Sequence, residues 1–210
     1  MTVQRVKPSS ADSRTDPDAA AEETDGRRRR SQDSRARIVS AMLELVHAGD
    51  ITPGAEQVAS RANVGLRTVF RHFSDMESLY AEMAQTIEAE MMKVVETPFS
   101  GATWREHLLE MIARRTAVYD RIGPYRRAAD VHRHQSRFLQ LAHDRVNAVG
   151  RELIKREIPA DLARDLTLLD TVDLLLSFET WNRLRRDQNL TPRRAREVLE
   201  QALKRAVGED

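Results

Sequence analysis

The strongest constraint on the fold is a short segment of helical periodicity, residues 55–62, that lies directly before a second one. Thr52 and Pro53 precede this segment and are typical of a helix start. Asn63 predicts its end, because asparagine tolerates the left-handed backbone conformation. Since another helix must begin two or three residues later, the pair predicts a helix-turn-helix. The small apolar face of the first helix consists of Ala55, Val58, Ala59 and Ala62.

The second helix of the pair begins at Gly65 or Leu66 and separates its side chains into two faces. At about 100° per residue, its apolar side chains fall within an arc of about 100°. Polar and basic side chains occupy the opposite arc. We expect the apolar face to anchor the helix and the basic face to point outward. The anchoring set is Leu66, Val69, Phe70 and Phe73, and the outward set is Arg67, Thr68, Arg71 and His72.

The rest of the chain also carries helical periodicity, and no strand pattern of alternating apolar and polar residues persists. We therefore expect an all-α fold. The segment 161–186 is the most apolar and should be buried on more than one face. Gly123–Pro124 predicts a helix break. The expected helices run from about residue 33 to near 49, 77–97, 104 to the break at 123, 138 to the stop at 159, 161–186 and 191–207.

Composition excludes several classes of function. The 210 residues suffice for one long or two short domains with a buried core. The chain has no cysteine, which removes disulfides, thiolate catalysis and cysteine zinc sites. No apolar run predicts a membrane span or a secretory signal, so we expect a cytoplasmic protein. The net charge of +1 is uninformative about nucleic acid, so that question rests on local clusters of charge.

Enzyme chemistry has little support in the sequence. Gly-rich phosphate loops, nucleophile elbows and paired metal-binding histidines do not occur. His132 and His134 are two residues apart, which places them on different faces of a helix. We therefore expect no catalytic residue, no metal and no cofactor.

The stretch 34–80 resembles the N-terminal DNA-binding domain of TetR-family transcriptional repressors. That family's signature runs roughly Ile-Ala-x-x-Ala-Gly-Val-Ser-x-Gly-Thr-Leu-Tyr-x-His-Phe-x-x-Lys-x-x-Leu. The resemblance implies a helix-turn-helix domain over residues 31–76 and a larger helical ligand-binding and dimerisation domain over 77–210. For residues 98–210 it implies architecture alone. The signature matches without a gap at Val58-Ala59, Ala62-Asn63-Val64-Gly65, Thr68-Val69-Phe70, His72-Phe73 and Leu79.

The chain departs from the signature at several positions. Asn63 replaces the turn glycine, and Gly65 replaces the usual Ser or Thr cap, as Gly54 does for the preceding helix. Glycine caps cost only a few tenths of a kcal/mol against the best residues. Phe70 lacks the hydroxyl of the usual tyrosine, and Met76 stands where the family commonly has lysine. Both changes remove groups that contact phosphate.

The resemblance implies that the second helix of the pair enters the major groove of operator DNA. Arg67 is the expected base reader, because arginine can hold guanine O6 and N7 together. Thr68 is expected to meet a thymine methyl or a phosphate. Gly65 begins the helix. Contacts to the DNA backbone are expected from Arg71, His72, Gln57 and Arg61.

The first 30 residues have a different composition, with no periodicity and no aromatic residue. Such a segment buries too little apolar surface to offset its ordering entropy, so we expect an unfolded arm. It ends in a run of four arginines, which is either a solvated charge cluster or a DNA-contacting arm that compensates for Phe70 and Met76. The four are Arg27, Arg28, Arg29 and Arg30.

The family binds DNA as a homodimer, so the resemblance implies a second copy of this chain as a partner. The helices 161–186 and 191–207 are expected to form a four-helix interface with it. Asp170 and Asp173 interrupt that surface and either pair with arginine across the interface or face water. The expected interface residues are Leu169, Val172, Leu176, Val198, Leu199 and Ala202.

Repressors of this type leave DNA when a small ligand fills a cavity in the body, provided that the ligand prefers the released conformation. Helix 77–97 would transmit the change. The alternative is a DNA-binding dimer that responds to no ligand or to a protein partner, and it predicts a body without a cavity. Methionine and aromatic residues suit an adaptable apolar cavity. The candidates are Met83, Ile87, Met91, Trp104, His107, Leu108, Met111, Tyr119, Phe138, Phe178 and Trp181.

Overall fold

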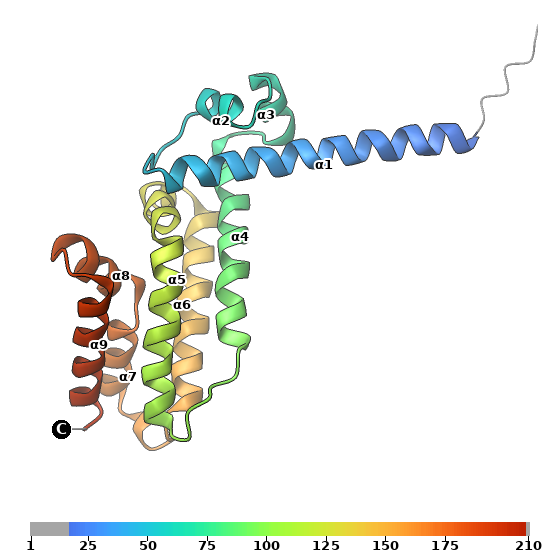
Figure 1. The fold of residues 1–210 in the computed structure, drawn as a ribbon. Helices are drawn as coiled ribbons and strands as arrows, with labels where there is room; N and C mark the ends of the chain where they lie inside the picture. The colour runs from blue at the N-terminus through green and yellow to red at the C-terminus, as the bar shows by residue number, and fades with distance from the viewer. Residues whose placement is uncertain (1–16, 209–210) are drawn as a thin grey trace, which may run out of the picture.

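The computed structural model describes residues 17–208 (Figure 1). Every regular element in that range is helical, which confirms the predicted all-α fold. None of these helices is long and apolar enough to cross a membrane. The elements are α1 (Pro17–His47), α2 (Ala55–Arg61), α3 (Leu66–His72), α4 (Met76–Glu96), α5 (Trp104–Arg133), α6 (Arg137–Glu157), η1 (Leu162–Arg164), α7 (Leu166–Leu175), α8 (Phe178–Asn182), η2 (Arg183–Asp187) and α9 (Pro192–Ala206).

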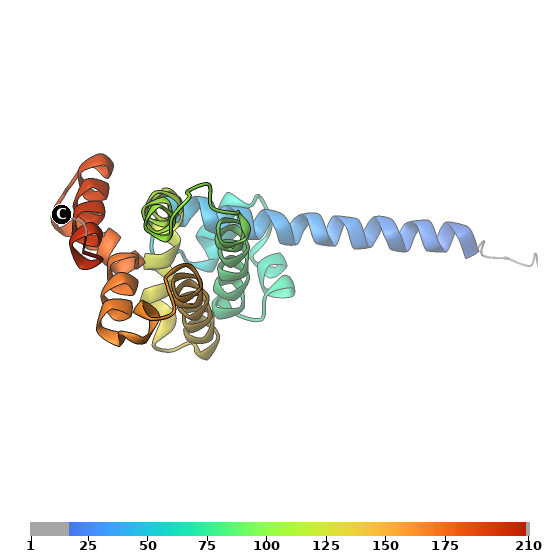
Figure 2. The ribbon, with the colours of Figure 1, turned by 90° about the horizontal axis from the view of Figure 1, so that it is seen from below.

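The helices are arranged around two hydrophobic cores. The helices α1, α2 and α3 lie at one end of the molecule, and α4 runs from them along α5 and α6 (Figure 1). The first core joins this end to α4, and Ala128 of α5 and Leu139 of α6 complete it. The second core lies in the body, where α7, α8 and α9 pack on the side of α5 and α6 away from α4 (Figure 2).

The predicted helix-turn-helix is confirmed, with its turn built as expected. The backbone of Gly54 is extended at the start of α2, and its N–H donates to the side-chain oxygen of Gln57 at 2.7 Å. Asn63 has a φ of 52°, the left-handed conformation that ends α2. Gly65 is extended at the start of α3, and the Thr68 N–H donates to its carbonyl oxygen at 2.8 Å. Two short helices are therefore joined by the four residues 62–65.

The anchoring face of α3 is narrower than its periodicity predicts. Val69 and Phe73 are buried, whereas Leu66 is 39% and Phe70 48% exposed. All four share one arc, but Val69 and Phe73 lie one turn apart toward one edge of it, where they pack in the first core. Leu66 and Phe70 lie toward the other edge and remain at the surface.

Residues 17–30 differ from the unfolded arm predicted for residues 1–30. They extend α1, which projects well beyond α2 and α3 (Figures 1 and 2). Residues 1–16 lie outside the described range. The sequence between Pro17 and Arg30 is rich in Ala, Glu and Arg, which favour the helix without any packing.

The helix break predicted at Gly123–Pro124 is wrong, because α5 runs through it to Arg133. A proline inside a helix costs about 3 kcal/mol. Here the surrounding residues are buried in two cores, with Ile122 in the second and Ala128 in the first. Burial of this segment offsets the lost backbone hydrogen bond.

The single helix predicted over 161–186 is also wrong, because α7 ends at Leu175 and α8 begins at Phe178. Ser177 caps the new helix by accepting from the Thr180 N–H at 3.1 Å. Its hydroxyl also donates to the Leu174 carbonyl oxygen at 2.7 Å. A serine that bonds to nearby backbone offers an alternative to continued helix.

Candidate functional site

The outward face of α3 presents basic side chains as predicted. Arg67 and Arg71 are exposed, and within the described residues neither forms a hydrogen bond or ion pair. Thr68 and His72 are half-buried beside them. Burial, together with nearby Arg71 and Arg35, lowers the pKa of His72. The imidazole is therefore neutral at pH 7, and its positive charge does not contribute to this face.

The two predicted contacts on α2 are already engaged by acidic neighbours. The Gln57 amide donates to Asp50 at 2.9 Å, and Arg61 pairs with Glu44 at 3.4 Å. Both side chains are exposed. An exposed ion pair of this length is worth at most about 1 kcal/mol. Each group can therefore exchange its present partner for a phosphate at small cost.

The arginine run lies on the projecting part of α1. Arg28, Arg29 and Arg30 are exposed, and the carbonyl oxygen of Arg30 accepts from the Ser34 hydroxyl at 2.9 Å. The side chain of Arg27 lies outside the described residues. These residues therefore belong to a helix, and not to the unfolded arm that the sequence predicts.

The helix-turn-helix is tied to the body at the junction of α1, α3 and α4. Arg35 of α1 donates to the carbonyl oxygen of His72 at 2.7 Å and pairs with Glu82 of α4. Its guanidinium lies over the Phe73 ring, 4.4 Å from the centroid. On the body side, the Ser136 hydroxyl donates to Glu77 at 2.6 Å. These contacts connect α4 both to the end of α3 and to the start of α6.

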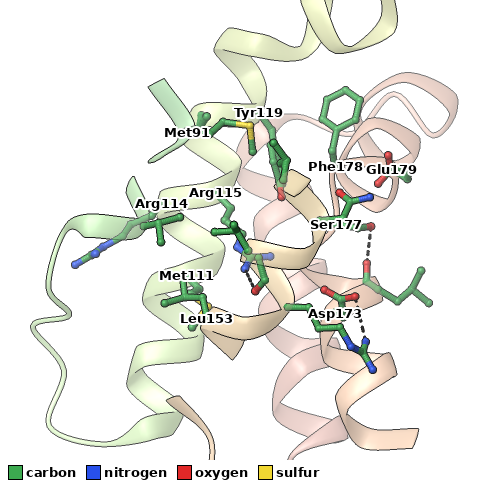
Figure 3. Close-up of a pocket in the computed structure, with 18 of the residues that line it drawn as sticks. Met91, Met111, Arg114, Arg115, Tyr119, Leu153, Asp173, Ser177, Phe178 and Glu179 are labelled. Carbon is green, nitrogen blue, oxygen red and sulfur yellow. Dashed lines mark hydrogen bonds and ion pairs between the residues drawn. The ribbon is translucent and has the colours of Figure 1, made fainter. Parts of the chain in front are cut away.

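The body contains a cavity of about 430 Å³, lined by residues of α4 to α8 and the α7–α8 junction (Figure 3). Four of the eleven predicted lining residues contribute to it: Met91, Met111, Tyr119 and Phe178. A smaller cavity of about 50 Å³ adjoins it and is lined by Met83, Ile87 and again Met91. Arg126 lines both cavities, so it lies between them.

Five predicted lining residues serve other purposes. Leu108 and Trp181 are fully buried in the second core, and Phe138 packs against the first. The guanidinium of Arg105 lies over the ring of Trp104, 4.3 Å from the ring centroid. His107 lies at a separate surface hollow, where its ring bonds to Glu157 at 2.8 Å and to the Gly101 carbonyl at 2.9 Å. The predictions failed because apolar periodicity does not distinguish a cavity wall from a filled core.

One wall of the main cavity is polar and is held by side chains of α5. The Tyr119 hydroxyl donates to the Leu176 carbonyl oxygen at 2.9 Å, the acceptor that the break after α7 leaves available. Arg115 donates to the same oxygen at 3.3 Å and to the Gly150 carbonyl at 2.8 Å (Figure 3). Burial is the main cause of the raised pKa of Tyr119. The hydroxyl therefore stays protonated and remains a donor.

Further charges at the cavity form ion pairs within this chain. Arg151 of α6 bonds to Asp170 at 2.5 Å and to Asp173 at 3.3 Å. The two aspartates thus pair with an arginine of their own chain, and the Asp170 side chain, 65% exposed, also faces water, which was one of the two alternatives. Arg126 bonds to Glu179 and to the His143 ring, each at 3.2 Å.

Most predicted interface residues lie in the chain's own core. Leu169, Val172, Leu176 and Leu199 are buried there, so they are not available to a partner. Val198 and Ala202 are half-buried. On the same elements the exposed large apolar side chains are Leu166, 66% exposed, and Leu174, 62% exposed. The error arose because both faces of α7 are apolar and periodicity cannot tell which one the chain covers itself.

The arginines that line the cavity were not predicted from the sequence. Arg115 lies one helical turn from Met111 and from Tyr119, and both of those residues were predicted to line a pocket. A charged residue within such an apolar stripe was the available signal. Arg126 and Arg151 had no comparable signal, because their positions at the cavity depend on contacts with α8 and α7. No cluster among the described residues has enough His, Asp or Glu to hold a metal ion.

The geometry is that of an all-α protein with a helix-turn-helix at one end and a cavity in its helical body. No protein-family model and no curated protein sequence matches the chain. Solved structures do. A transcriptional regulator from Rhodococcus sp. Rha1 is 18% identical, with a TM-score of 0.65, over 83% of this chain and 96% of that one. A TetR-family transcriptional regulator from Streptomyces coelicolor is 19% identical, with a TM-score of 0.65, over 84% and 80%.

A third similar structure is NalD, the secondary repressor of the MexAB-OprM multidrug efflux pump in Pseudomonas aeruginosa. It is 19% identical, with a TM-score of 0.58, over 85% of this chain and 97% of NalD. The likeness spans both the helix-turn-helix end and the body. The chain therefore has the fold of TetR-family transcriptional regulators, as the resemblance in residues 34–80 implies.

Proposed function

We propose that this chain is a sequence-specific DNA-binding transcriptional regulator of the cytoplasm. It acts as a homodimeric repressor that a small ligand releases from a pseudo-palindromic operator. The observation that carries the proposal is α3, a helix of a helix-turn-helix with Arg67 and Arg71 exposed and unpaired among the described residues. Such a helix fits the major groove, with its first residues near the base edges.

In this proposal the side chains of α3 have different tasks. Arg67, at the second position of the helix, reads a base, and Thr68 meets a thymine methyl or a phosphate. Arg71 and neutral His72 contact phosphates and fix the register. Phe70 has no hydroxyl for a phosphate, but its exposed ring is available for apolar contact with the groove.

Other contacts to the DNA backbone come from outside α3. Gln57 and Arg61 of α2 exchange their acidic partners for phosphates. The arginines of α1 extend the basic surface beyond the helix-turn-helix and compensate for Met76. Together these contacts provide the salt-dependent part of the affinity.

Ligand release is favoured over a ligand-independent dimer by the cavity of about 430 Å³, because the alternative predicts a filled body. Cavities of this size are typical of small-molecule sites. Met91 of α4 lines the cavity, and Leu79 at the other end of α4 packs in the first core with Phe73. A ligand that displaces α4 therefore changes how α3 packs against the first core. Dimerisation occurs through α7 and α9, where Leu166 and Leu174 form the exposed apolar surface.

Selection of bound duplexes from random DNA tests the proposal. The full chain should enrich a pseudo-palindrome whose half-sites lie about one helical turn, or a multiple of it, apart. Enrichment of no such site would exclude a sequence-specific regulator.

A further inference from the structure

Arg115 is a cavity-lining cation that has no anionic partner among the described residues. The bonds of its guanidinium there are to the main-chain carbonyls of Gly150 and Leu176, and it adjoins the Tyr119 hydroxyl. Within the described residues, no carboxylate lies at ion-pair distance from it, whereas Arg114 beside it pairs with Glu110. Arg114 points away from the other labelled residues (Figure 3). Carbonyl dipoles compensate a buried charge less fully than a carboxylate does.

Arg126 provides a second vacant donor at the same cavity. The residue is only 9% exposed, and its Nε is buried without a hydrogen-bond partner. Its guanidinium lies over the Phe178 ring, 5.1 Å from the centroid, and the Tyr119 ring packs edge-on against Phe178 at 5.6 Å. A buried donor left without an acceptor is costly, and most such donors in proteins are bonded.

The acidic side chains at the cavity are, by contrast, all engaged. Asp170 and Asp173 share Arg151, and Glu179 pairs with Arg126. Glu179 is also half-exposed to solvent. A cationic ligand would therefore have to displace an arginine from one of these carboxylates. An anionic ligand displaces no carboxylate from Arg115, because the bonds that Arg115 makes among the described residues are to main-chain carbonyl oxygens.

Gly150 shows that α6 leaves room for the Arg115 guanidinium. A methyl group at this position would lie 3.3 to 3.7 Å from the guanidinium atoms. Glycine inside a helix is destabilising relative to alanine, and Gly150 lies well inside α6. The close approach of Arg115 gives this glycine a physical role.

We infer that the cavity binds an amphipathic organic anion, a monocarboxylate with an extended apolar tail. The carboxylate accepts hydrogen bonds from Arg115, with Tyr119 and Arg126 completing the polar wall. The tail lies along Met91, Met111 and Phe178. The inference names the class of ligand for the proposed regulator and thus rests on that function.

Three probes with the same ten-carbon tail test the inference on the full-length wild-type protein: decanoate, decanol and decylamine. Binding is measured by titration calorimetry at one pH and salt concentration. Because a hydrogen bond to a charged group is worth more than about 1.4 kcal/mol, decanoate should bind at least about 10-fold tighter than decanol. Decylamine should bind more weakly than either. Equal or tighter binding of decanol or decylamine overturns the inference.

Two matched variants on α5 then locate the site. Arg115→Met should abolish the preference for decanoate over decanol, and Arg115→Lys should retain part of it. Arg121→Met is the control, because Arg121 is exposed on the same helix and does not line the cavity. Retention of the full preference in a folded Arg115→Met protein would contradict the assignment. If that variant does not fold, the comparison of the three probes on wild type decides alone.

DNA release separates this inference from the function on which it rests. Decanoate, and not decylamine, should dissociate the wild-type protein from its selected DNA site. If a DNA site is selected and decanol releases it as well as decanoate does, the proposed regulatory function is supported and the inferred preference for an anion is wrong. If no DNA site is selected but decanoate binds preferentially, the inferred anion site is supported and the proposed regulatory function is wrong.

Discussion

The guanidinium of Arg35 on α1 donates a hydrogen bond to the main-chain carbonyl oxygen of His72, the last residue of α3, at 2.7 Å. The same guanidinium pairs with Glu82 on α4. One side chain thus links the end of α3 to the helix that leads into the body. Because α4 also lines the cavity, Arg35 connects α3 to an element of the cavity wall.

Replacement of Arg35 by alanine should lower the free energy of unfolding by about 1 to 2 kcal/mol, the sum of a partly exposed ion pair and a bond to a main-chain carbonyl. DNA affinity should also fall, because α3 loses a constraint on its last turn. Urea denaturation and DNA titration measure the two effects. Arg37→Ala is the control, since Arg37 is exposed on the same helix. Equal effects of both variants would show that the loss comes from removing a positive charge from α1 and not from the particular contacts of Arg35.

Arg67→Ala should relax base preference at one position in each half-site. The bidentate contact of an arginine with guanine is worth about 1 to 3 kcal/mol of discrimination. Repeating the selection from random DNA with the variant measures this preference. A uniform loss of affinity at unchanged preference would identify Arg67 as a phosphate contact.

Phe70 and Phe73 should differ greatly in their contribution to stability. Phe73 is 2% exposed, so Phe73→Ala should cost about 3 to 5 kcal/mol. Phe70 is 48% exposed, so Phe70→Ala should cost less than about 1 kcal/mol while weakening DNA binding. Denaturation of the two variants under the same conditions makes the comparison. A large loss for Phe70→Ala would restore the wider anchoring face that the periodicity predicts.

Leu174→Glu should convert the proposed dimer to a monomer with little loss of unfolding free energy, because Leu174 is 62% exposed in the single chain. DNA binding should fall with it, since two half-sites need two copies. Sedimentation velocity measures the oligomeric state. Leu141→Glu on α6 provides the control, as Leu141 is also exposed. An unchanged dimer in the Leu174 variant would exclude this surface as the interface.

Acidification should destabilise the protein in part through His143. Burial, and then the nearby Arg126 and Arg133, lower the pKa of His143, against the opposing effect of Glu179 and Asp130. The unfolded chain therefore binds this proton at a higher pH than the folded chain does. Stability from this group is fully present above the unfolded pKa of about 6.5 and is lost as pH falls from there through the folded pKa.

Thermal unfolding between pH 7 and pH 5 checks this sign in wild type and in His143→Asn. The variant should show a shallower fall of the melting temperature with decreasing pH. A parallel His47→Asn variant, at an exposed position, should follow the wild-type slope. If the melting temperature falls equally steeply with pH in all three proteins, His143 does not contribute to the loss of stability in acid.

Features that depend on neighbours along the chain were predictable from the sequence. Asn63 ends α2 in the left-handed conformation, and Asp75 caps α4 by accepting from the Ser78 N–H at 2.8 Å. Thr191 likewise accepts from the Arg194 N–H at 3.2 Å at the start of α9. These bonds span at most a few residues, so residue type alone indicates them. The helix-turn-helix and its outward basic face follow from the same local rules.

Features that depend on which elements meet were decided by tertiary structure. Leu169 is buried whereas Leu166 and Leu174 on the same helix are exposed, because only one face of α7 meets the rest of the chain. Pro124 stays inside α5 because two cores hold its neighbours.

The polar wall of the cavity has the same origin. Arg115 of α5 meets Gly150 of α6 and Leu176 at the end of α7, residues that lie far apart in the sequence. Periodicity along one helix reports which side chains share a face, and it carries no information about what that face contacts. The sequence alone therefore determined an all-α chain with a helix-turn-helix. Packing among α4 to α8 decided where the cavity lies and left Arg115 there with no carboxylate partner among the residues that the structure describes.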